Sequence, residues 1–115
     1  MTPHTKTWRI IAGLSGFIAV VMGAVGAHAI ADAHLSALAE KASLYQLLHS
    51  LLLLWLLDQP ELRLARWLVL AGLILFCGSL YLKALTGWPN ASYFAPMGGM
   101  SFMGAWLFIA FRRAG

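Results

Sequence analysis

The chain has 115 residues, of which 61% are hydrophobic and only 10% are charged, and its mean hydropathy is +0.78. A chain of this length cannot bury so much apolar surface in a water-soluble core, so the composition excludes an ordinary soluble domain and indicates an integral membrane protein. The formal net charge is +4, but the eight Lys and Arg stand one or two at a time beside apolar runs. This distribution is typical of membrane-flanking residues and argues against a nucleic-acid partner.

The first apolar run extends from Trp8 to Ile30 and follows a polar tail, Met1–Thr7, that carries no helix signal. At about 1.5 Å per residue, a helix over residues 8–30 is long enough to cross a hydrocarbon core of roughly 30 Å. Small residues line one face of this helix, and such a stripe predicts a groove for a neighbouring helix. The stripe consists of Ala12, Gly16, Ala19, Gly23, Gly26 and Ala27.

His28 follows the small stripe directly and allows two interpretations. If the helix continues unbroken past Gly26, the helical wheel turns the imidazole away from the stripe, toward lipid or the headgroup level. If the helix bends or ends near Gly26, His28 turns inward and shares a site with His49.

The segment after the first span is less apolar and carries Asp32, His34 and Glu40. Its remaining apolar positions recur with helical spacing, which predicts a short amphipathic helix lying at the membrane surface. A second span is predicted over about residues 42–57. It ends before a polar hairpin around Pro60, because proline cannot continue the incoming helix.

A third span is predicted over about residues 64–85, where a cluster of turn residues follows. A fourth span is predicted over about residues 96–111, before the basic pair Arg112 and Arg113. Residues 1–115 are therefore predicted to form a single all-α membrane domain, an integral four-helix bundle.

The basic residues also predict the orientation of the bundle. Cytoplasmic loops of membrane proteins carry an excess of Lys and Arg. With four spans, six of the eight basic residues lie on the side of the two chain ends, and only Lys41 and Lys83 lie on the other. We therefore expect a multi-pass protein of the inner (plasma) membrane with both termini in the cytoplasm.

A candidate polar site lies toward the outer half of the predicted bundle. On the second span Tyr45, Gln46 and His49 share one face, and His49 lies about 12 Å from the outer end of the span, by helix rise. An ionisable residue at that depth is a candidate functional residue, and the alternative is a neutral histidine hydrogen-bonded to Gln46, to Tyr45 or to a backbone carbonyl. The full candidate set is His28, Glu40, Tyr45, Gln46, His49, Ser79 and Lys83, and the glycines expected at helix contacts are Gly16, Gly23, Gly26, Gly98 and Gly99.

Several motifs in a fixed order resemble the YgdD-type family of small inner-membrane proteins, a family of unknown function with mitochondrial relatives in animals. The motifs are Gly23-Ala24-Val25-Gly26-Ala27-His28, Glu40 with Tyr45, Gln46 and His49, Gly78-Ser79-Leu80-Tyr81, Leu85-Thr86-Gly87, and Pro96-Met97-Gly98-Gly99. The resemblance implies a four-helix membrane protein whose activity is not established. One departure is a hydrophilic insert around Trp88 to Tyr93, which is longer than the compact turn expected of the family.

Three classes of function follow from these features. The one that needs the least chemistry is a structural, interaction or lipid-binding bundle, with membrane lipids, a membrane protein or a second copy as partner. The alternatives are a small transporter or proton-coupled carrier that uses His49, and a cofactor protein with His28 and His49 as haem ligands or a quinone near Tyr45 and His49. We expect no enzyme, no metal site and no resident cofactor, because the chain shows no catalytic triad and no metal-ligand spacing, and the single Cys77 is expected in the core.

Overall fold

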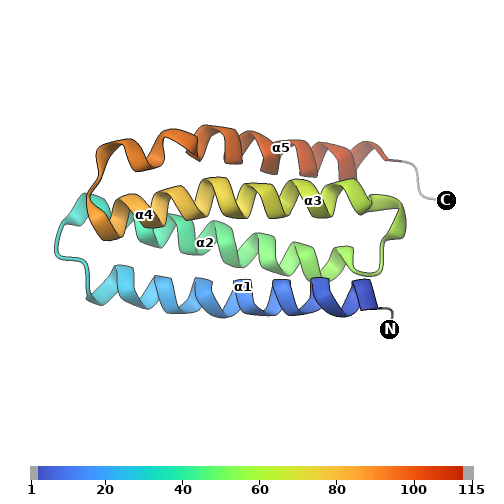
Figure 1. Ribbon diagram of the computed structural model, residues 1–115, viewed down its shortest axis with the longest axis horizontal. Helices are drawn as coiled ribbons and strands as arrows, with labels where there is room; N and C mark the ends of the chain where they lie inside the picture. Colours follow the sequence, from blue (N-terminus) through green and yellow to red (C-terminus); the bar gives the residue numbers. More distant parts are fainter. Residues whose placement is uncertain (1–2, 113–115) are drawn as a thin grey trace.

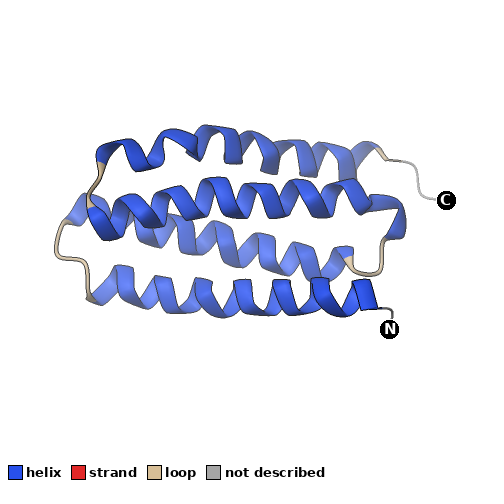
Figure 2. Ribbon diagram, in the orientation of Figure 1, coloured by secondary structure: helices blue, strands red, loops and turns tan. Residues whose placement is uncertain are grey.

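The computed structural model describes residues 3–112, and Arg113, which was expected to flank the last span, lies outside them. Nearly all of the described chain is helical, and the loops are confined to the ends of the helices (Figure 2). The all-α prediction is confirmed. The principal helices are α1 (Pro3–His28), α2 (Ala33–Leu56), α3 (Arg63–Gly72), α4 (Gly78–Thr86) and α5 (Ala95–Phe111).

Short helical turns join these elements. A π-helical turn, η2 (Leu73–Cys77), links α3 to α4, so that Pro60–Thr86 forms one helical segment that begins with the 3₁₀ turn η1 (Pro60–Leu62). The hydrophilic insert is also helical and forms the 3₁₀ turn η3 (Pro89–Phe94) before α5. The described residues therefore contain four long helical segments.

The four segments run antiparallel to their neighbours in the chain, and both chain ends lie at the same end of the molecule (Figure 1). The molecule measures 49 × 25 × 18 Å, so its long axis follows the helices. Helix α1 packs mainly on α2, α2 packs on α4, and α5 packs on α3 and η2. Helices α1 and α5 are therefore the two outer members of the bundle.

Three segments of the described chain are long and apolar enough to cross a membrane: His4–His28, Pro60–Thr86 and Pro89–Phe111. Helix α2 has 24 residues but is less apolar, because it carries Glu40 and Lys41 in its first half and His49 in its second. The composition and these helices identify a membrane protein.

Two predictions about local structure are wrong. The segment before Lys41 does not form a separate amphipathic helix, because α2 continues from Ala33 without a break. Asp32 caps this start by accepting a hydrogen bond from the Leu35 backbone N–H at 3.0 Å, and no Gly or Pro follows within α2. The polar tail was expected to lack a helix, but α1 already begins at Pro3, a residue suited to a first helical turn.

Small residues allow close helix contacts near the end of α1 and near the start of α5. A Cβ atom added at Gly23 would lie 2.8 Å from the Ser43 Oγ, and one at Gly26 would lie 3.0 Å from the Ala39 Cβ. A Cβ at Gly98 would overlap the backbone of Phe76. At Gly16 and Gly99 the added Cβ would find ordinary van der Waals space. Close approach of the backbone thus depends on Gly23, Gly26 and Gly98.

Candidate functional site

The structure does not bring the seven residues of the candidate polar site together. His28 and Glu40 are exposed near the loop between α1 and α2, and Lys83 is partly exposed near the end of α4. Ser79 is buried and donates a hydrogen bond to the Phe76 carbonyl at 3.1 Å. Only Tyr45, Gln46 and His49 remain as a group in the middle of the bundle.

His28 lies far from His49. Helix α1 runs unbroken past Gly26 and ends at His28, which stays exposed. Gly26 does not bend the helix, because its backbone is held against α2, where the Ser36 hydroxyl donates to the Gly26 carbonyl at 2.6 Å. His49 lies about 24 Å along α2 from Ala33, by helix rise. Of the two interpretations of His28, the structure supports the exposed one.

A chain of hydrogen bonds joins three helices next to His49. The Tyr81 hydroxyl donates to the Gln46 Oε1 at 2.6 Å, and the Gln46 Nε2 donates to the Ser15 Oγ at 3.2 Å. The Ser50 hydroxyl lies 2.7 Å from the Ser15 Oγ and 2.6 Å from the Gln46 carbonyl. These buried groups satisfy one another, so the network fixes α1, α2 and α4 in register.

His49 is buried, with 4% of its surface exposed, and both ring nitrogens have a partner. The Trp106 indole N–H can only donate, so the His49 Nε2, at 3.1 Å, must accept. The Nδ1 lies 2.7 Å from the Tyr45 carbonyl, which can only accept, so Nδ1 carries the proton. The network therefore assigns a neutral Nδ1–H histidine whose two nitrogens are both engaged.

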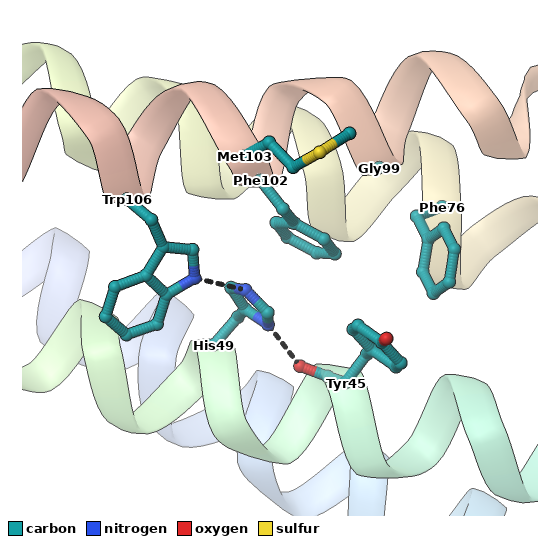
Figure 3. Close-up of a pocket in the computed structure, with 7 residues that line it drawn as sticks. All are labelled: Tyr45, His49, Phe76, Gly99, Phe102, Met103 and Trp106. Atoms are coloured by element: carbon teal, nitrogen blue, oxygen red, sulfur yellow. Dashed lines mark hydrogen bonds between the residues drawn. The ribbon is translucent and has the colours of Figure 1, made fainter.

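Aromatic rings surround this histidine (Figure 3). The Phe102 ring stacks on the imidazole with 3.7 Å between ring centroids, and the Tyr45 ring lies 4.9 Å from the Phe76 ring. Between α2 and α5 these side chains border a groove of about 270 Å³. Its lining residues are Tyr45, His49, Phe76, Gly99, Phe102, Met103 and Trp106.

Packing behind the groove explains its position. A Cβ atom added at Gly72 would overlap the Phe102 ring, so glycine allows this ring to lie against the backbone of α3. The π-helical turn brings the backbone of Phe76 against Gly98 of α5. Helix α5 therefore packs closely on α3 and η2. It contacts α2 chiefly through the rings of His49, Phe102 and Trp106.

The side chains that line the groove are mostly apolar. Its floor is made of His49 and Phe102, which are buried, while Tyr45, Met103 and Trp106 at its rim are exposed. Among the described residues no group of three His, Cys, Asp or Glu side chains could hold a metal ion. The lining is therefore better suited to an apolar group than to a charged one.

Sequence reasoning identified Tyr45, Gln46 and His49 but missed their partners Phe102, Trp106 and Gly72 as site residues. Phe102 and Trp106 are four residues apart, the spacing that puts two side chains on one helix face, and this was the available signal. The contact between Trp106 and His49 spans 57 residues of sequence, and local patterns do not report such pairs.

Comparisons with known proteins return related chains. A family model described as "Protein of unknown function (DUF423)" matches residues 22–99. A UPF0382 membrane protein of Staphylococcus aureus is 36% identical over 113 residues, which cover 90% of this chain and 92% of the relative. The UPF0382 inner membrane protein YgdD of Escherichia coli (strain K12) is 34% identical over 106 residues, which cover 84% of this chain and 81% of that protein. No solved structure matches the chain.

Proposed function

The chain belongs to the DUF423 family of membrane proteins, as its motifs predicted, and on that premise we propose that it is a four-span bundle that holds the apolar chain of a lipid between α2 and α5. The observation that supports this proposal is the aromatic groove, whose histidine, His49, already has both ring nitrogens bonded. Such a groove attracts a ligand by shape and dispersion rather than by charge.

The exposed side chains of α2 support its role as a fourth span. Gln46, His49 and Ser50 lower the hydropathy of this helix, yet all three are buried against the bundle. The opposite face is apolar and exposed, as a lipid-facing surface should be. That face carries Leu44, Leu47, Leu48, Leu51 and Leu54.

The distribution of basic residues supports an orientation with both chain ends in the cytoplasm. Both ends lie at the same end of the molecule, together with the connection between α2 and α3 (Figure 1). Lys6, Arg9, Arg63 and Arg66 belong to these segments. The excess of basic residues at this end matches the positive-inside rule. The name of the Escherichia coli relative supports an inner-membrane location.

The size and opening of the groove favour one acyl or isoprenoid chain. Its volume of about 270 Å³ is below the roughly 300–1,000 Å³ of sites for drug-sized ligands, so a slender chain fits better than a porphyrin. Tyr45, Met103 and Trp106 are all at least partly exposed, so the groove opens to the side of the bundle, where lipid chains lie in a membrane.

The carrier and haem interpretations find no supporting contact. A haem ligand or a proton carrier needs a free imidazole nitrogen, and those of His49 bond Tyr45 and Trp106. The second histidine of the haem interpretation, His28, is exposed at the end of α1.

The proposal can be tested by counting the lipid molecules that stay bound to the purified full-length protein in native mass spectrometry. Met103 lines the groove, whereas Met100, on the same helix and similarly exposed, does not. We expect Met103→Trp to fill the groove and reduce lipid retention several-fold, and Met100→Trp to retain lipid as the wild type does.

A second variant that fills the groove is needed in case the tryptophan of Met103→Trp turns away from it. A Cβ atom at Gly99 would lie 3.9 Å from the Phe76 Cδ1, so Gly99→Leu extends a side chain into the same groove. Equal lipid retention by wild type, Met103→Trp and Gly99→Leu would contradict the proposal.

A further inference from the structure

A second cavity, of about 750 Å³, lies at the end of the molecule that holds both chain ends. The start of α1, the connection between α2 and α3, and the start of α3 form its walls. Arg63 and Arg66 line it together with His4, Trp8 and Trp67. The cavity shares no lining residue with the groove between α2 and α5, so a ligand in this cavity is independent of the proposed function.

Arg66 is the exceptional residue of this cavity. Only 8% of its surface is exposed, and its buried Nε has no hydrogen-bond partner. Among residues 3–112 no carboxylate forms an ion pair with its guanidinium. Its guanidinium carbon lies 5.9 Å from the centroid of the Trp8 ring.

A guanidinium whose Nε is buried without a partner favours an anion beside it, because arginine keeps its charge at every physiological pH. Taking this charge out of water is costly, and a single cation–π contact recovers only part of the lost hydration. Snorkelling to water is possible at this end of the molecule, since Arg9 and Arg63 are exposed. Arg66 is instead buried in the lining of the cavity beside Trp8, whose ring packs edge-on against Trp67 with 5.0 Å between centroids.

We propose that this cavity binds a phosphate group, with the Arg66 guanidinium as the central cation and Arg63 at its mouth. Guanidinium forks match phosphate oxygens in two parallel hydrogen bonds, and basic pockets between spanning helices suit anionic headgroups. The volume is within the range of small-molecule sites. The phosphate belongs either to an anionic phospholipid headgroup or to a free phosphate ion.

Asp58 is the competing partner for Arg66. It lines the same cavity, but it is exposed and forms no ion pair with Arg66. If a shift of its side chain neutralised Arg66, no external anion would be needed. Removing this carboxylate therefore separates the two explanations.

The test uses the full-length protein in nanodiscs of phosphatidylcholine with or without phosphatidylglycerol, and native mass spectrometry to identify the lipid that stays bound. We expect wild type to enrich phosphatidylglycerol, and Arg66→Gln to lose this enrichment by at least about tenfold, the effect of one charge-assisted hydrogen bond. Arg66→Lys keeps the charge without the fork, so we expect an intermediate loss. Arg9→Gln, an exposed arginine outside the cavity, should enrich phosphatidylglycerol as wild type does.

A second arm titrates inorganic phosphate at constant ionic strength and follows thermal unfolding. A saturable rise in melting temperature that needs Arg66 identifies free phosphate as the source, whereas lipid enrichment without this rise identifies the headgroup. Asp58→Asn should strengthen binding in whichever arm responds, because it removes a competing charge.

Three results would overturn the proposal. The first is that neither arm distinguishes wild type from Arg66→Gln. The second is that Arg9→Gln loses as much phosphatidylglycerol as Arg66→Gln, which would mean a general surface charge effect. The third is that Asp58→Asn destabilises the protein as Arg66→Gln does and the double variant adds nothing, since Asp58 would then be the partner of Arg66.

Discussion

Gln46 connects the buried polar residues of the bundle. Its amide bonds Tyr81 on α4 and Ser15 on α1, so it is satisfied on both sides of α2. In an apolar interior each unpaired polar group is costly, which is why Gln46, Ser15 and Ser50 are all buried together. This arrangement rigidifies the bundle.

Truncation of Gln46 tests the contribution of this network. We expect Gln46→Ala to lower the free energy of unfolding by about 1–2 kcal/mol, because the Tyr81 hydroxyl and the Ser15 hydroxyl each lose a partner. Denaturant titration of the protein in mixed micelles measures this change. Gln59→Ala is the matched control, because Gln59 lies between α2 and α3 and its side chain forms no hydrogen bond within residues 3–112. Similar losses for both variants would contradict a stabilising network.

The residues of the site were only partly predictable. The shared face of Tyr45, Gln46 and His49 follows from helix geometry alone, and a satisfied neutral histidine was one of the two interpretations of His49. Its partner Trp106 could not be identified, because that choice depends on how α5 lies against α3. The buried Nε of Arg66, which has no hydrogen-bond partner, could not be predicted either, since a basic residue near a span end normally reaches water.

At the scale of helices, local sequence signals define most helix ends, and tertiary contacts define the other features of the helices. Gly87 ends α4 with a φ of 74°, a conformation in which glycine is favoured, and this turn was predicted. The charges at Glu40 and Lys41 suggested a boundary, but α2 passes through them because no helix breaker is present. The π-helical turn Leu73–Cys77 has no sequence signature, and it is defined by its packing against α5.

Gly98 is the position where helix packing is most sensitive to a side chain. We expect Gly98→Ala to lower the free energy of unfolding by about 1–3 kcal/mol, because its methyl group would overlap the backbone of Phe76. Gly99→Ala provides the control, since its methyl group would lie 3.9 Å from the Phe76 Cδ1. The same denaturant titration compares the two variants. If Gly99→Ala proved as destabilising as Gly98→Ala, loss of glycine rather than steric overlap would be responsible.

At the scale of the whole molecule, the number of spans decides on which side of the membrane each loop lies. In a four-span protein His4 and Asn90 face opposite sides, whereas in a three-span protein without α2 they face the same side. Cys77 is buried and can be replaced by alanine to give a cysteine-free background.

Cysteine labelling distinguishes these topologies in intact cells. In the Cys77→Ala background, we expect Asn90→Cys to react with a membrane-impermeant maleimide from outside, and His4→Cys to react only after permeabilisation. Both positions are exposed in the structure, so burial does not limit the reaction. Reaction of both cysteines from one side would contradict the four-span topology, and reaction of His4→Cys alone from outside would reverse the orientation.

The central claim is that the groove between α2 and α5 holds a lipid chain, and photo-crosslinking tests it most directly. The protein is reconstituted with a phospholipid that carries a diazirine in its acyl chain, irradiated, and mapped by peptide mass spectrometry. We expect crosslinks to concentrate at Tyr45 and Met103 beyond their share of exposed surface, and to fall at Tyr45 in Gly99→Leu. Crosslinks spread evenly over exposed apolar residues such as Phe17 and Met100, and unchanged in Gly99→Leu, would contradict the claim.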